Sequence, residues 1–152
     1  MKKLTFYLPF LLTGLISCSS GNKAIKLDYD SNLKENIYKF PSGFLWGTAT
    51  ASYQVEGGIT NDWSTNKLDA GKAAEHYDKF EEDFKFAKSI NNNAYRFSIE
   101  WARIEPEQGK FDLKEVAHYK KVLKSLKENG LKPMVTLHHF TNPVWLAKMG
   151  GW

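Results

Sequence analysis

Two segments of the chain have the hydrophobic spacing of amphipathic helices. In the first, residues 74–90, apolar residues recur at steps of three and four, and charged residues fill the positions between them. This spacing predicts a helix with one buried face, and the three asparagines at 91–93 end it. The predicted buried face consists of Ala74, Tyr77, Phe80, Phe84, Ala87 and Ile90.

The second helical segment follows Pro106 and a turn at 108–109. Asp112 and Glu115 have the spacing of a capping box, and Gly130 is placed to end the helix. The lysines of this segment form a charged face that we expect to be solvated. The residues expected to face the core are Leu113, Val116, Leu123 and Leu126.

Three short apolar stretches, at 43–49, 94–99 and 132–137, alternate with these helices. Apolar runs of this length, bounded by Pro, Asn or Gly, predict buried strands. Strands separated by amphipathic helices predict an α/β fold with a parallel sheet and right-handed crossovers. A doubly wound sheet and an eight-stranded barrel both begin in this way, so the pattern by itself leaves both open.

The amino-terminal segment has the pattern of a secretion signal. Lys2 and Lys3 precede an apolar run at 4–16, which is shorter than the about 20 residues of a membrane-spanning helix and fits a signal peptide. The run ends in Leu-Ile-Ser-Cys. This ending resembles a bacterial lipobox, in which the cysteine, here Cys18, becomes the lipidated first mature residue.

This pattern divides the chain into a lipoprotein signal peptide at 1–17, a polar tether at 18–38 and a domain at 39–152. We expect lipid on Cys18 to anchor the protein to a membrane surface of the bacterial envelope without crossing it. The alternative is a plain signal peptide in which Cys18 is incidental.

Composition and charge exclude several classes of protein. Cys18 is the only cysteine, which excludes a disulfide framework and a cysteine-based zinc site. The net charge of +4 includes Lys2 and Lys3, which lie in the signal peptide, and the remaining basic residues form no basic stripe. We therefore expect no nucleic-acid partner. No glycine-rich loop lies between a strand and the next helix, which disfavours a phosphate-binding domain.

Four motifs in the domain carry a resemblance to a known family. They lie at 44–57 (FLWGTATASYQVEG), 61–64 (NDWS), 95–104 (YRFSIEWARI) and 135–143 (VTLHHFTNP), and the Gly-Gly-Trp at 150–152 follows them. In this order and at this spacing they resemble the amino-terminal part of glycoside hydrolase family 1, the β-glucosidase family. The resemblance covers about residues 40–152.

The resemblance implies a (β/α)₈ barrel, a fold that typically needs about 250 residues. The domain at 39–152 has room for three strands. We therefore expect the amino-terminal three βα units of a truncated barrel, with the remaining barrel strands encoded downstream as a partner.

The activity implied by the resemblance is hydrolysis of β-O-glycosidic bonds with retention, without metal or cofactor, and with a β-linked saccharide or glycoside as the bound partner. Whether the sugar is gluco, galacto, fuco or 6-phospho stays open. A retaining glycosidase uses two carboxyl groups about 5–5.5 Å apart, one as acid/base and one as nucleophile.

The resemblance also implies roles for three residues. The family's glutamine of the first motif and second histidine of the third-strand motif bind the nonreducing-end sugar, and they correspond to Gln54 and His139. The family's second-strand arginine lies beside the nucleophile and corresponds to Arg96, whose cation would keep that carboxylate ionised. Because adjacent strand residues face opposite sides, only one of His138 and His139 is expected to point into the site, and we favour His139.

Neither catalytic glutamate of the family is assigned to this chain. The family's nucleophile lies in a Glu-Asn-Gly motif, which residues 128–130 match by letters, but here the motif ends a lysine-rich helix. The acid/base lies in an Asn-Glu-Pro motif, and Glu105-Pro106 lacks the asparagine. We therefore expect the chain alone to be inactive. Two interpretations follow: part of a β-glycosidase, or a non-catalytic or non-functional lipoprotein fragment of an interrupted gene.

Overall fold

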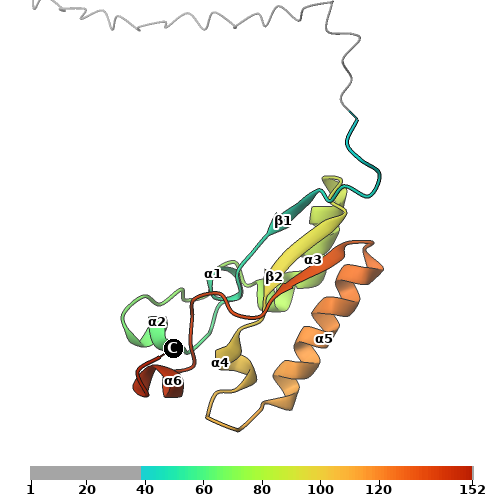
Figure 1. Ribbon diagram of the computed structural model, residues 1–152. Coiled ribbons are helices and arrows are strands. Elements are labelled where there is room, and N and C mark those ends of the chain that lie inside the picture. The colour runs from blue at the N-terminus through green and yellow to red at the C-terminus, as the bar shows by residue number, and fades with distance from the viewer. Residues whose placement is uncertain (1–38, 152) are drawn as a thin grey trace, which may run out of the picture. The chain divides into compact units, whose positions relative to one another are not determined.

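The computed structural model describes residues 39–151, in which three parallel strands form one sheet (Figure 1). The strands are β1 (Gly47–Ala49), β2 (Ala94–Ser98) and β3 (Lys132–Thr136), in the order β1-β2-β3. In this register Ala94 of β2 lies between Gly47 and Lys132. A Cβ atom at Gly47 would lie 2.5 Å from the Ala94 carbonyl oxygen, so this edge of the sheet requires glycine.

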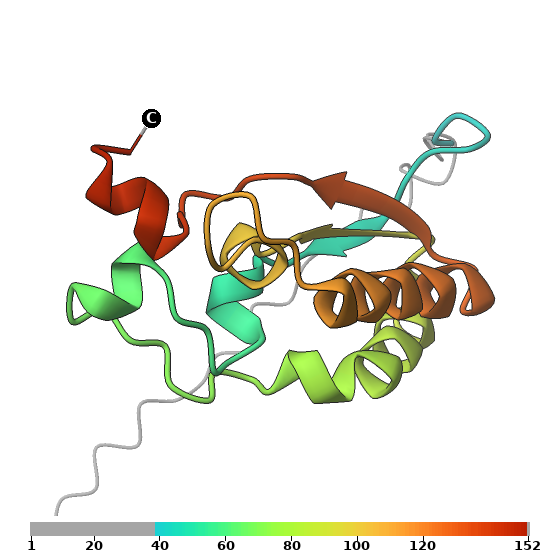
Figure 2. The ribbon, with the colours of Figure 1, turned by 90° about the horizontal axis from the view of Figure 1, so that it is seen from below.

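Two long helices connect the strands, and both lie on the same face of the sheet (Figure 2). They are α3 (His76–Ser89) between β1 and β2, and α5 (Leu113–Glu128) between β2 and β3. Four short helices lie towards the carboxyl ends of the strands (Figure 1). These are α1 (Ser52–Val55), α2 (Asp62–Thr65), α4 (Trp101–Ile104) and α6 (Val144–Lys148).

The main core lies between the sheet and the two long helices. Alternate residues of β2, Tyr95 and Phe97, point into it, as the period of two in a strand requires. Phe84 and Leu126, one from each helix, have no exposed surface. The buried members of this core are Phe80, Phe84, Ala87, Tyr95, Phe97, Tyr119, Val122, Leu126 and Leu131.

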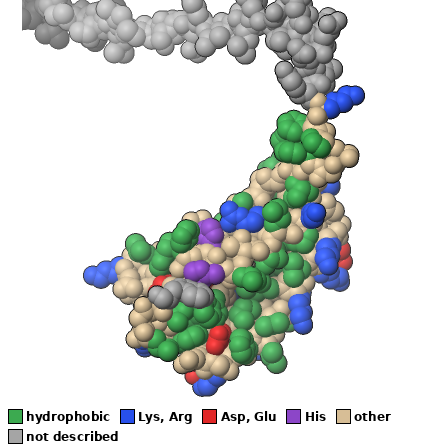
Figure 3. Space-filling model, viewed as in Figure 1, with side chains coloured by type: hydrophobic (Ala, Val, Ile, Leu, Met, Phe, Trp, Pro, Cys, Tyr) green, Lys and Arg blue, Asp and Glu red, His purple; other side chains and the backbone are tan. Residues whose placement is uncertain are grey.

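Within residues 39–151, no helix covers the opposite face of the sheet (Figure 2). Figure 3 looks onto this face, where hydrophobic and histidine side chains lie at the surface. Met134 of β3, which is in register with Arg96, is 49% exposed on this face. Apolar side chains on the open face of a parallel sheet are the ones that a closed barrel buries in its interior.

The predicted strands and helices are present, but they are shorter than predicted, and some residues predicted to be buried are exposed. The first strand is confined to β1, and residues 43–46 of the predicted strand lie outside it, although the Trp46 carbonyl accepts a backbone hydrogen bond from Ala94 at 3.1 Å. Ala74 and Ile90 lie outside α3 and are exposed. Leu113 is 76% exposed, so its assignment to the buried face of the second helix was wrong. It is the first residue of α5, and the first buried residue of this helix is Tyr119, six positions later.

The predicted capping box at the start of α5 is only half formed. The Asp112 carboxylate accepts hydrogen bonds from the backbone N–H groups of Lys114 at 2.8 Å and Glu115 at 3.4 Å. The Glu115 carboxylate does not return to the Asp112 backbone but accepts a hydrogen bond from the Tyr77 hydroxyl of α3 at 3.0 Å. A contact between the two long helices has therefore replaced the local contact.

No helix in the described part of the chain is long and apolar enough to span a membrane. The predicted signal peptide, Cys18 and the tether lie outside the described residues.

Candidate active site

Arg96 lies in the middle of β2, on the open face of the sheet. Its neighbours Tyr95 and Phe97 point into the helix-covered core, so the alternation of the strand directs Arg96 to the other side. The side chain is half-buried. It is paired in register with Ala49 of β1 and Met134 of β3, so it lies at the centre of this face.

His139 lies in the loop after β3 and contacts Arg96. The Nη1 atom of Arg96 is 3.5 Å from Nδ1 of His139. A guanidinium group has donors and no acceptor, so Arg96 donates and Nδ1 accepts. This interaction places the imidazole proton on Nε2, which makes Nε2 the donor available to a ligand.

His138 takes a different direction from its neighbour. Its side chain is exposed, and its Nε2 is 3.1 Å from Oδ1 of Asn142, within the same loop. Its ring meets the Trp101 ring edge to face at 6.5 Å. The structure therefore brings His139, and not His138, to Arg96.

Gln54 lies in α1, in the segment that leaves the sheet directly after β1. Its side chain is exposed, and among residues 39–151 its amide forms no hydrogen bond to the protein, so the amide is accessible from solvent. An amide offers one acceptor and one donor group, which suits two adjacent hydroxyl groups. The structure gives no contact between Gln54 and the Arg96–His139 pair.

An aromatic stack borders the site, and the sequence interpretation assigned it no role. The Phe140 ring is 66% exposed and lies parallel to the Trp63 ring, with centroids 6.4 Å apart. Trp63 in turn meets Tyr53 of α1 edge to face at 5.9 Å. An exposed aromatic face next to hydrogen-bonding groups is suited to a ligand with both apolar and polar surfaces. The only signal for these two residues in the sequence was their place in the motifs: Trp63 belongs to the second motif and Phe140 to the fourth.

Two carboxylates that the sequence interpretation also missed hold the loops of the site. Asp62 at the start of α2 accepts hydrogen bonds from the backbone N–H of Asn142 at 2.8 Å and from its side-chain amide at 3.0 Å. Glu100, which is 1% exposed, accepts a hydrogen bond from the Thr141 hydroxyl at 3.1 Å. Both contacts join the loop after β3 to segments that follow other strands.

A second buried carboxylate, Glu56, lies between α1 and the two helices α4 and α5. It accepts hydrogen bonds from Nε of Arg103 and from the Tyr119 hydroxyl, both at 2.9 Å. Burial raises the pKa of Glu56 to about 7, although Arg103 and Tyr119 act in the opposite direction. Nearby, burial and the charge of Arg103 lower the pKa of His118 to about 4.

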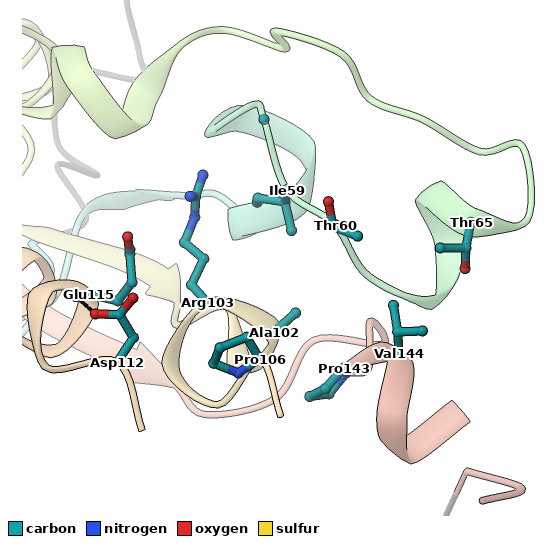
Figure 4. A pocket seen from close by; sticks show the side chains of 11 residues that line it. Ile59, Thr60, Thr65, Ala102, Arg103, Pro106, Asp112, Glu115, Pro143 and Val144 are labelled. Atoms are coloured by element: carbon teal, nitrogen blue, oxygen red, sulfur yellow. Dashed lines mark hydrogen bonds between the residues drawn. The ribbon is translucent and has the colours of Figure 1, made fainter. Parts of the chain in front are cut away.

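A groove of about 480 Å³ lies between the loops and α2, α4 and α6 (Figure 4). Its charged groups already have partners within the fold. Arg103 pairs with Glu56, Asp112 caps α5, and Glu115 accepts from Tyr77. These groups hold helices together, so the groove is a structural junction, separate from the Arg96–His139 pair.

Glu128, in the Glu-Asn-Gly match, and Glu105, before Pro106, both serve local structure. Glu128 is the last residue of α5, and its exposed carboxylate lies 3.6 Å from Nζ of Lys124. Glu105 accepts hydrogen bonds from the indole N–H of Trp101 at 2.8 Å and from the backbone N–H of Gly109 at 2.7 Å. Residues 39–151 contain no group of three or more His, Cys, Asp or Glu side chains arranged to hold a metal ion.

The chain matches the family described as glycosyl hydrolase family 1 over residues 36–152. Beta-glucosidase A of Thermotoga maritima is 39% identical over 133 residues, which cover 77% of this chain and 30% of that protein. The cytosolic beta-glucosidase of Homo sapiens is 38% identical over 131 residues, covering 74% of this chain and 28% of that protein.

The fold matches solved structures of the same kind. A beta-glycosidase from Pyrococcus horikoshii superposes with a TM-score of 0.71 at 43% identity, over 74% of this chain and 28% of that chain. A family 1 β-glucosidase from Thermotoga maritima superposes with a TM-score of 0.69 at 38% identity. The chain thus spans less than a third of the length of these relatives, and its three strands are part of a (β/α)₈ barrel.

Proposed function

Because this chain belongs to glycosyl hydrolase family 1, we propose that it supplies three βα units of a barrel that hydrolyses β-linked glycosides with retention of configuration. The contact between Arg96 and His139 at 3.5 Å is the observation that carries the proposal. It joins a side chain of β2 to one in the loop after the adjacent strand β3, near the carboxyl end of a parallel sheet, which is where barrel enzymes have their active sites.

In this proposal His139 and Gln54 bind the sugar. The Nε2–H of His139 donates to one hydroxyl group, because its Nδ1 already accepts from Arg96. The solvent-accessible amide of Gln54 binds two neighbouring hydroxyl groups through its oxygen and its nitrogen. Hydrogen bonds of this kind orient the sugar ring for the oxocarbenium-like transition state.

Arg96 supports the nucleophile in the same proposal. A guanidinium group stays charged at all relevant pH values and stabilises the ionised form of a neighbouring carboxylate. The acid/base and the nucleophile are supplied by later strands of the barrel, since Glu105 and Glu128 are engaged in local contacts. A bound β-glycoside would then be cleaved by glycosyl transfer to the nucleophile, followed by attack of water.

Complementation tests this function. The chain alone is expected to leave p-nitrophenyl β-glycosides unhydrolysed, and a polypeptide carrying the other five βα units of a family barrel is expected to restore turnover when it is added. Proton NMR of the first sugar released should show the β-anomer. Failure of several such polypeptides to restore turnover would favour a non-catalytic fragment, and turnover by the chain alone that Glu128→Gln abolishes would show that this glutamate was wrongly excluded.

The adjacent histidines provide a matched pair of variants in the complemented barrel. His139→Ala is expected to lower kcat/KM about tenfold to hundredfold, because one hydrogen bond to the sugar is lost. His138→Ala is expected to change it by less than about threefold, since that ring contacts Asn142 and Trp101. Equal losses for both variants would contradict the assignment of His139.

We also propose that Cys18 carries lipid and holds the protein at a membrane surface. The support is the position of this cysteine directly after Leu15-Ile16-Ser17 and the lack of a second cysteine in the sequence. Labelled palmitate fed to a bacterial host is expected to enter the protein and to be lost in Cys18→Ala, while Ser19→Ala keeps the label. Label that persists in Cys18→Ala would overturn the proposal.

A further inference from the structure

Glu100 is a buried acidic side chain with no role in the proposed chemistry. It lies two residues after the end of β2, immediately before α4, and is 1% exposed. We propose that Glu100 is a positioning residue, which holds the loops after β1 and β3 so that Gln54 and His139 face the same ligand as Arg96. The proposal rests on the proposed function for the ligand, but its geometry is tested without turnover.

The Glu100 carboxylate joins three segments that are distant in the sequence. The Ser52 hydroxyl of α1, two residues before Gln54, donates to it at 2.9 Å. The Thr141 hydroxyl, two residues after His139, donates to both of its oxygens at 3.1 Å. The side-chain amide of Asn61, which caps α2, donates at 3.4 Å.

The direction of the hydrogen bonds in this network requires a carboxylate at position 100, because every side-chain bond to Glu100 is one that it accepts. The Ser98 hydroxyl donates to the Ser52 hydroxyl at 2.9 Å, so the proton of Ser52 is directed to Glu100. All the side-chain partners of Glu100 in the described residues therefore donate, and a carboxylate is a side chain that only accepts. A glutamine would place its NH₂ group against one of these donors and leave a buried group unsatisfied.

The loop that carries His139 has a strained turn that this anchor holds. The backbone N–H of Thr141 donates to the carbonyl of His139 at 2.9 Å, and Phe140 between them has a φ of 69°. A hydrogen bond from residue i+2 to residue i around a left-handed residue is the rare and strained form of the γ-turn. Such turns persist where surrounding contacts hold them, and here the Thr141 side chain is tied to Glu100.

The experiment measures the imidazole of His139 by ¹⁵N NMR in the full chain. The wild type is expected to show one neutral tautomer, with its proton on Nε2, because Nδ1 accepts from Arg96. In Glu100→Gln the His139 signals are expected to move towards the averaged position of two tautomers. Glu107→Gln, at an exposed carboxylate, is the matched control and should keep the wild-type spectrum.

A lower melting temperature alone would reflect a structural role, so the tautomer decides the outcome. Glu100→Gln that stays folded and keeps the single Nε2–H tautomer would overturn the proposal. If Glu100→Gln does not fold, Thr141→Val replaces it, because it removes only the hydroxyl contact of the His139 loop. An unchanged His139 tautomer in Thr141→Val would equally overturn the proposal, whereas failure of complementation would bear only on the proposed function.

Discussion

Phe84→Ala is expected to lower the free energy of unfolding of this chain by about 3–5 kcal/mol. Phe84 has no exposed surface and lies at the centre of the core between the sheet and the long helices. Its ring centroid is 5.0 Å from that of Tyr95 and 5.4 Å from that of His76. Truncation removes these contacts and leaves a cavity that the strand and the helices cannot fill by small movements.

Phe86 provides the matched control for this prediction. It lies on the same helix two residues later, but it is 72% exposed. Phe86→Ala is therefore expected to change the free energy of unfolding by less than about 0.5 kcal/mol. Urea titration followed by circular dichroism measures both variants, and similar losses would show that the core does not carry the stability of the fold.

The contribution of Glu56 to the stability of the chain is expected to fall as the pH rises from about 4.5 to 7. Burial raises the pKa of this carboxyl from 4.5 to about 7 in the folded protein. Between these values the unfolded chain ionises while the folded chain keeps its proton, so rising pH favours unfolding. At 1.36 kcal/mol per pKa unit the Glu56 contribution is about 3 kcal/mol.

His118 acts in the opposite direction over almost the same range. Because burial lowers its pKa from 6.5 to about 4, the unfolded chain takes up a proton first as the pH falls, and this favours unfolding at low pH. The stability of the wild type therefore varies less with pH than either group alone would dictate. The contribution of Glu56 is seen as a difference between wild type and Glu56→Gln.

The measurement compares urea unfolding of wild type and Glu56→Gln from pH 4.5 to 7.5. Glu56→Gln is expected to lose an amount of unfolding free energy that does not depend on pH, because one of the donors from Arg103 and Tyr119 loses its acceptor. The difference in unfolding free energy, variant minus wild type, should also rise by about 3 kcal/mol from pH 4.5 to 7.5, because only the wild type loses the Glu56 contribution. If the unfolding free energies of the two proteins change with pH in parallel, the raised pKa of Glu56 is contradicted.

The order of strands and helices was determined by the sequence itself. Local rules sufficed, because the period of 3.6 in α3 and α5 and the cap of Asp112 depend on residues a few positions apart. The motifs likewise identified Gln54, Arg96 and His139 as candidates. The predicted limits of the elements were less accurate. Only residues 47–49 of the predicted first strand pair with β2 in register, and the buried face of α5 begins at Tyr119 rather than at Leu113.

Only the tertiary structure decided how the candidate site is assembled. The Arg96–His139 contact, which selects the imidazole tautomer, joins residues 43 positions apart. Glu100 contacts Ser52 and Thr141, which lie 48 and 41 positions away. Such hydrogen bonds leave no periodic trace in a single sequence, because each depends on where separate loops meet in space. A buried carboxylate gains its role from donors brought to it by the fold.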